Sequence, residues 1–329
     1  MTASAATALA PPLWRRVIRF CFGFEPMRHA WWETFLFRIA IAYIAWDTIG
    51  GPSRFHSQPA PHGLAAWGVD FSWLGSEDIA RWFVPLLGVC LMLYIAFPLV
   101  RPLLERENKR ARCSEWFTAV VLLPPLLASF GHGTLGNSQG GIDHTTQLVT
   151  LALFAQWLAH VWTAVRLKAP SSYNSQQLAA DWTRQLVAAT YVVSAISKLI
   201  ESKGGWWHEA PYFGLQIAKS TGQAYYEWLT PPDNAAWLAQ FFFDHPIVAQ
   251  LFIGAGLPLE FFAFLALRNR RIALFYGMAL YSFHVGVSEI MHLGFLYHKI
   301  LLLAFFVNPV WWTAKSVFIF KHRTPNSTH

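Results

Sequence analysis

Residues 82–100 read WFVPLLGVCLMLYIAFPLV, a stretch without one charged side chain. At a rise of about 1.5 Å per residue, a helix of this length covers the ~30 Å hydrocarbon core of a bilayer. Because backbone groups inside hydrocarbon must be paired within the segment, such blocks form helices. The sequence therefore predicts an all-α, polytopic transmembrane helix bundle with about eight spanning helices, at residues 31–50, 82–100, 116–130, 145–166, 183–201, 247–267, 272–292 and 294–312.

Composition and charge support a membrane protein. Of the 329 residues, 54% are hydrophobic and 13% are charged, about half of the roughly 25% charged residues of a soluble domain. The net charge of +7 comes from Lys and Arg in short clusters between the apolar blocks. This pattern orients a membrane protein and argues against nucleic acid as a partner.

The basic clusters also predict the topology. All of them fall on one side of the membrane if both termini are cytoplasmic. We therefore expect a cytoplasmic N-terminal segment (1–30), a membrane domain (31–312) and a cytoplasmic tail (313–329), in the inner membrane of a bacterium. The long loop 202–246 then lies on the outer side, where Phe213, Ile217, Tyr225 and Leu229 recur at roughly helical intervals. They indicate an amphipathic helix or lid in the outer interface, or alternatively a linker rich in aromatic residues.

Ionisable residues inside the apolar blocks are the candidate site, because charge at membrane depth is costly. Lys198 lies about one turn from the outer end of its helix. A desolvated amine is a usable general base, although Lys198 could instead snorkel to the headgroups or pair with Glu201. His144 opens the helix at 145–166, where it and Asp143 could simply cap the helix.

The helix at 272–292 carries further polar residues. Tyr281, His284, Ser288 and His292 share one face at i+3 and i+4 spacing, with Glu289 beside them. His284 could also be a core histidine that is bonded to a neighbouring helix. His284 and His292 lie about 12 Å apart along the axis, too far for one metal ion, so we predict no metal site.

On the inner half, Arg38 lies about 10 Å from the cytoplasmic end of its helix, and Glu260 lies at about the same depth on the helix at 247–267. Equal depth and opposite charge predict a buried structural ion pair between them.

Five segments together resemble the HTTM family (horizontally transferred transmembrane domain) and the membrane domain of vitamin K-dependent gamma-glutamyl carboxylase. They are FLFRIAIAYIAWD, DHTTQLVTLALF, YVVSAISKLIESKGGWW, GAGLPLEFFAFL and YSFHVGVSEIMHLGFLYHKILLLAFF, and the resemblance covers about residues 28–312.

The resemblance implies that Lys198 is the base that deprotonates a reduced quinone. It places His144 near the reacting oxygens and His284 in the same pocket, and Trp206 or Trp207 matches a tryptophan that follows the lysine. Asp143 stands where the carboxylase has an amide, and we expect no counterpart of that enzyme's large lumenal domain. The resemblance therefore extends to quinol chemistry rather than to carboxylation of protein glutamates.

We thus expect a membrane-embedded enzyme of this type that acts on a quinol or another lipid-soluble substrate. Its catalytic residues are Lys198, His144 and His284, and its substrate-binding residues are Asp143, Trp206, Trp207, Tyr281, Ser288, Glu289 and His292. Expected partners are membrane lipids, the lipid-soluble molecule and a peptide or protein substrate on the outer side. The alternative is a noncatalytic maturation or immunity protein that captures a peptide through its outer loops.

Overall fold

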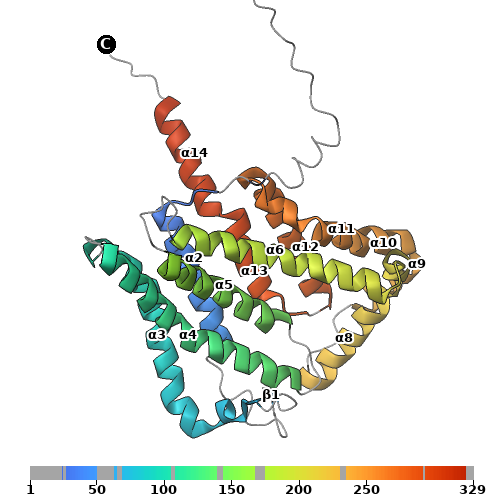
Figure 1. The fold of residues 1–329 in the computed structure, drawn as a ribbon. Coiled ribbons are helices and arrows are strands. Elements are labelled where there is room, and N and C mark those ends of the chain that lie inside the picture. The colour runs from blue at the N-terminus through green and yellow to red at the C-terminus, as the bar shows by residue number, and fades with distance from the viewer. Residues whose placement is uncertain are drawn as a thin grey trace, which may run out of the picture.

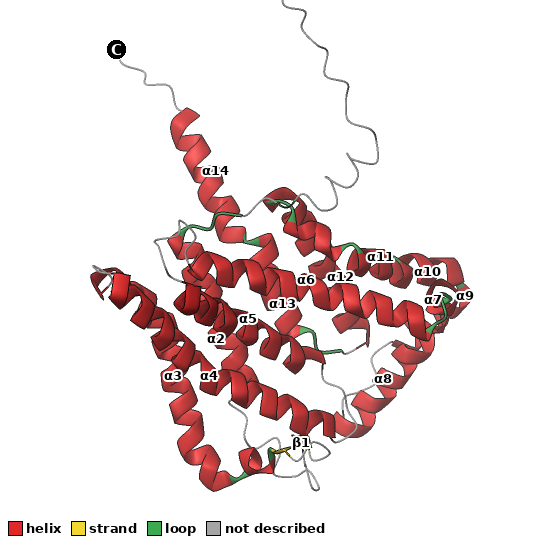
Figure 2. Cartoon of the chain, viewed as in Figure 1, coloured by secondary structure: helices red, strands yellow, loops and turns green. Residues whose placement is uncertain are grey.

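Helices make up nearly all of the protein that the computed structural model describes, which is residues 24, 27–49, 63–64, 69–104, 108–138, 144–166, 175–229, 235–291 and 293–323 (Figures 1 and 2). The long helices are α2 (Trp31–Ile49), α3 (Glu77–Leu104), α4 (Asn108–Ser138), α5 (His144–Arg166), α6 (Ser175–Glu201) and α12 (Arg270–Met291). The shorter ones are α7 (Trp206–Glu209), α8 (Phe213–Trp228), α9 (Ala235–Asp244), α10 (Pro246–Gly254), α11 (Gly256–Phe261), α13 (Leu296–Leu302) and α14 (Pro309–Arg323).

Short elements complete the described chain. The 3-10 turns are η3 (Ser72–Gly75), η4 (Ala210–Tyr212) and η5 (Ala263–Leu267), and η6 (Leu303–Val307) is a π-helix. The strands β1 (Gly63–Leu64) and β2 (Val69–Asp70) pair antiparallel.

Several helices are compatible with an integral membrane protein, as the sequence predicts. Within the described residues, four segments are long and apolar enough to cross a bilayer: Arg81–Val100, Ala111–Leu135, Thr145–Arg166 and Leu296–Val317. A fifth is added if the bent pair Trp237–Asp244 and Pro246–Phe261 counts as one span. The total of eight spans and the cytoplasmic placement of both termini stay predictions.

Helices α2, α6 and α12 do not meet that criterion, because polar residues interrupt their apolar sequence. Many of these polar side chains are buried within the protein, among them Arg38, Thr183, Arg184 and His284. These side chains reach other elements of the protein: Arg184 Nη2 donates to the backbone oxygen of Ala266 at 2.8 Å, and Thr183 Oγ1 accepts from Gln156 Nε2 at 2.8 Å.

The double proline of the third apolar block does not interrupt its helix. Pro124 and Pro125 both lie inside α4, which runs unbroken from Asn108 to Ser138.

The block at 247–267 is divided into α10, α11 and η5. Just before this block, α9 meets α10 at Pro246 with a bend of 101°. Proline lacks the N–H that would continue a helix into the preceding turn, so a helix readily begins at that residue.

Two hydrophobic clusters hold the helices together. The larger one is formed by the helices α2, α3, α4, α5 and α6 together with α12, α13 and η6. It includes Ile41, Leu122, Leu153 and Leu301. The smaller one joins α8, α9, α10 and the end of α12, through residues such as Ile217, Phe242 and Ile253. Helix α12 contributes Leu280 to the first cluster and Val287 to the second, so it links the two.

The contact between α12 and η6 yields a stability prediction. A Cβ on Gly277 would lie 2.9 Å from the Cβ of Phe306 and 3.1 Å from the backbone N of Val307, and backbone cannot move aside cheaply. We expect Gly277→Ala to lower the free energy of unfolding by about 1–3 kcal/mol, measured by thermal unfolding in detergent. Gly222→Ala, where a Cβ meets nothing within 4 Å, is the control and should raise helix stability by up to about 1 kcal/mol. Equal behaviour of the two variants would contradict the tight contact.

Candidate functional site

Lys198 forms an ion pair with Glu260 across two helices. The Nζ of Lys198, on α6, donates to Oε2 of Glu260, on α11, at 2.5 Å. The Glu260 side chain is 5% exposed and the Lys198 side chain 27%, and Ser194 Oγ donates to the same carboxylate oxygen at 3.3 Å. The pair is therefore largely shielded from solvent, and one of its members, the amine, is partly accessible.

The ion pair expected between Arg38 and Glu260 is wrong, because the carboxylate of Glu260 is bound by Lys198. The expectation assumed that residues 247–267 form one straight helix. The chain there divides into α10, α11 and the 3-10 turn η5. A 3-10 turn rises about 2 Å per residue rather than about 1.5 Å, so a straight-helix count does not fix the depth of Glu260. Lys198 likewise does not pair with its own helix neighbour Glu201, which is exposed.

Arg38 belongs to a different buried network. Its Nη1 donates to the backbone oxygen of Tyr94 on α3 at 2.7 Å, and its Nη2 lies 3.2 Å from Nε2 of His160 on α5. The other ring nitrogen of His160 lies 2.6 Å from Oε2 of Glu115 on α4, and Ser175 Oγ on α6 donates to the same carboxylate. Since a guanidinium only donates, His160 accepts from Arg38 at Nε2 and donates to Glu115 at Nδ1.

A second polar position lies two turns before Lys198 on α6. The hydroxyl of Tyr191 is 2.8 Å from Nε2 of His284 on α12, and both residues are buried. The other nitrogen of His284, Nδ1, is buried and has no hydrogen-bond partner among the described residues. Tyr191, Ser194 and Lys198 follow one another at i+3 and i+4, so they line one face of α6.

Aromatic rings surround the His284 imidazole. Its ring centroid lies 5.2 Å from that of His298 and 4.6 Å from that of Phe295, and Tyr191 lies against both imidazoles. Lys198 thus lies on the face of α6 that also carries Tyr191, and His284 contacts this face through its hydrogen bond to Tyr191.

Trp206 lies beside the Lys198 amine and Trp207 does not share that contact. The Nζ of Lys198 is 5.4 Å from the centre of a Trp206 ring, a distance that favours attraction between the cation and the ring. The Trp206 N–H is buried without a described partner. Trp207 is 42% exposed and packs on Gly254 of α10.

The remaining predicted residues divide into three groups. Ser288 accepts from Lys299 Nζ at 3.4 Å, and Tyr281 packs on the larger hydrophobic cluster. Glu289 is exposed. His144 is the first residue of α5, but its side chain, like Asp143 and His292, lies outside the described residues.

No group of three or more His, Cys, Asp or Glu side chains that could hold a metal ion occurs in the described part of the chain.

Sequence reasoning missed Tyr191 and the partners of Arg38. Tyr191 could have been found, because it lies seven residues, or two helical turns, before Lys198 on the same helix face. Glu115 and His160 also carried a signal, since each is an ionisable residue within or beside an apolar block.

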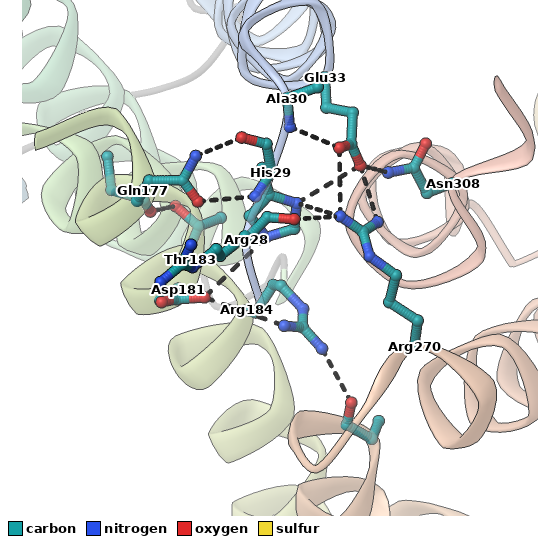
Figure 3. A network of polar contacts seen from close by, with 12 residues as sticks. Arg28, His29, Ala30, Glu33, Gln177, Asp181, Thr183, Arg184, Arg270 and Asn308 are labelled. Carbon is teal, nitrogen blue, oxygen red and sulfur yellow. Dashed lines mark hydrogen bonds and ion pairs between the residues drawn. The ribbon is translucent and has the colours of Figure 1, made fainter. Parts of the chain in front are cut away.

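A third network joins the start of α2 to α6, α12 and η6 (Figure 3). The buried carboxylate of Glu33 accepts from Arg270 Nη1 at 2.7 Å and from Asn308 Nδ2 at 2.6 Å. The backbone N–H of His29 donates to Gln177 on α6 at 2.8 Å. Segments far apart in the sequence are therefore tied together at this end of the protein.

Comparisons with protein-family models, with curated proteins and with solved structures find no match. The resemblance to the HTTM family therefore stays a prediction, and the chemistry must be argued from the residues.

The Lys198–Glu260 pair predicts strong energetic coupling. We expect Glu260→Gln to cost about 3–5 kcal/mol of stability, because it leaves a shielded ammonium without a counter-charge. Removing the ammonium as well, in Lys198→Met with Glu260→Gln, should restore roughly 1–3 kcal/mol. Unfolding in detergent of the wild type, both single variants and the double variant measures this coupling. Lys203→Met, at an exposed position after α6, is the control and should show no coupling to Glu260→Gln. If the stability losses of Lys198→Met and Glu260→Gln simply add in the double variant, the ion pair is refuted.

His29 predicts a pH dependence of stability. Burial lowers the pKa of His29 below its ordinary value of 6.5, against the opposing effect of its hydrogen bond to Glu33. Below about pH 6.5 the unfolded chain therefore binds a proton that the folded protein does not. The contribution of His29 to stability is complete above that pH and is lost as the pH falls below it.

Thermal unfolding at about pH 7.5 and about pH 5.5 tests this expectation. His29→Gln should lose less stability between the two pH values than the wild type does. His208→Gln, at an exposed position, should behave as the wild type. Parallel losses in wild type and His29→Gln would rule out a lowered pKa at His29.

Proposed function

We propose that the protein is a membrane-embedded enzyme of the carboxylase-like HTTM type, in the inner membrane of a bacterium, with Lys198 as its general base. Its substrate is a quinol or another lipid-soluble molecule with an acidic hydroxyl. The observation that supports this proposal most strongly is the Lys198–Glu260 pair, in which the carboxylate is 5% exposed and the amine 27%. A base must be held in place and must still be reachable by its substrate, and the pair meets both conditions.

The carboxylate of Glu260 gives Lys198 a route to its basic form. At 2.5 Å, the ammonium can pass a proton to Oε2 of Glu260, which leaves a neutral amine and a neutral carboxylic acid. The amine then accepts the hydroxyl proton of the substrate at Nζ.

The other residues have supporting roles in the proposal. Tyr191 orients His284. The buried Nδ1 of His284 has no hydrogen-bond partner among the described residues, and the proposal pairs it with a substrate oxygen. Trp206 lies against the Lys198 amine and offers a buried N–H. The proposal gives His144 the stabilisation of the developing oxyanion, with Asp143 beside it.

A noncatalytic protein that captures a peptide is the second candidate. The observation in its favour is the exposed apolar side of α8, where Tyr226 is 82% and Leu229 81% exposed. It predicts that replacement of Lys198 leaves peptide binding intact. The enzyme proposal predicts instead that this replacement abolishes deprotonation of the quinol.

Proton transfer to Lys198 can be measured directly with menadiol as the probe. Under argon, the ultraviolet spectrum of menadiol mixed with detergent-purified protein reports the fraction present as the anion. We expect the wild type to shift bound menadiol toward the anion near neutral pH, because Lys198 accepts the hydroxyl proton, and we expect Lys198→Met to abolish this shift.

Lys203→Met is the matched control and should equal the wild type, because it removes an exposed lysine five residues further along. Mass spectrometry of co-extracted lipids gives the substrate class independently. An undiminished anion signal in Lys198→Met would exclude this lysine as the base. The absence of any quinone in the wild-type extract, together with no binding of menadiol, would exclude the quinol.

A further inference from the structure

Helix α8 has apolar residues on two opposite sides. Phe213 and Ile217 are buried in the smaller hydrophobic cluster. The opposite side, named here the α8 exposed face, consists of Tyr212, Leu215, Ala218, Lys219, Gln223, Tyr225, Tyr226 and Leu229, all of them exposed. A helix on the surface of a soluble protein turns charged and polar residues outward, so the exposed face of α8 is not suited to water.

The exposures of its large side chains are high. Leu215 is 58% exposed, Tyr212 64%, Tyr226 82% and Leu229 81%. An exposed patch of this kind marks a surface that contacts a membrane or another protein. The described charged side chain of this face is Lys219, whose long stem can lie along apolar surface while its amine stays in the headgroup layer.

The α8 exposed face continues onto helices that belong to the membrane part. Helix α8 packs closely on α9, since Gly214 has room for no side chain next to the backbone oxygen of Ala239. Helix α9 carries the exposed Trp237 and continues through the 101° bend into α10. On α10, Ile247 is 69% and Leu251 61% exposed, within a segment apolar enough to be part of a span.

We propose that the α8 exposed face and Trp237 are covered by lipid, so that α8 and α9 lie in the headgroup layer at one surface of the membrane. The bend at Pro246 then marks the point where the chain turns from the membrane surface into the hydrocarbon. Three tyrosines and a tryptophan suit this position, because their rings combine an apolar body with a polar edge. Figure 1 shows α8 and α9 together at one end of the bundle, away from α14. This proposal does not rest on the chemistry of Lys198.

The test uses the whole protein in vesicles of phosphatidylethanolamine and phosphatidylglycerol. Single cysteines are placed at Leu215 and Tyr226 in a background without Cys21, Cys90 and Cys113, and each is labelled with a fluorescent maleimide. Both positions are exposed, so the fold should tolerate the label. Quenching is compared among lipids with a nitroxide near the headgroup, lipids with a nitroxide near the chain end, and iodide in the buffer.

We expect the shallow nitroxide to quench the labels at Leu215 and Tyr226 more strongly than the deep nitroxide or iodide does. A label at Leu251 is the lipid control and should be quenched by lipid nitroxides but not by iodide. A label at Lys203 is the water control and should show the reverse. Quenching of the α8 labels by iodide alone would place the face in water, and protection from all three quenchers would mean that protein covers it. Either result overturns the proposal.

Discussion

Charged groups cannot be left alone in a low-dielectric interior, and this constraint organises the described part of the chain. An unpaired buried charge costs several kcal/mol, so each such group requires a partner from another helix. Lys198 binds Glu260, and Arg38 connects through His160 to Glu115. Glu33 binds Arg270 and Asn308. Because each partnership joins helices that are distant in the sequence, polar contacts specify which apolar helices are neighbours.

Helix α6 takes part in all three networks and so acts as the central element. Its first turns bring Gln177 to the backbone of His29, and Ser175 to the carboxylate of Glu115. Its last turns carry Tyr191, Ser194 and Lys198 toward α11 and α12. Contact with lipid alone would not select one rotation of such a helix about its axis. The polar residues fix that rotation, and the same rotation presents Lys198 to Glu260.

The sequence predicts the helices better than it predicts their contacts. Hydrophobic blocks and their lengths indicated helical segments at the right places, and the 16% of aromatic residues marked many of their ends. The Arg38–Glu260 error shows the limit of this reasoning. Depth counted along a straight helix does not say which helices are neighbours, and the division of residues 247–267 into α10, α11 and η5 is not visible in the apolar pattern. Tyr191, which contacts His284 and lies two turns before Lys198 on the same face of α6, could be found only by following that helix face beyond Lys198.

The position of His284 suggests how the two hydrophobic clusters serve the site. On α12, Leu280 belongs to the larger cluster and Val287 to the smaller one, and His284 lies between them. Trp206, which contacts the Lys198 amine, packs on the smaller cluster as well. The larger cluster therefore fixes α6 with Tyr191 and Lys198, while the smaller one places Trp206 and the surroundings of His284. A rearrangement of α8 and α9 against α12 would alter the environment of the imidazole and the amine without repacking the main core. Contact of α8 with lipid would then bear directly on the residues proposed to carry the chemistry.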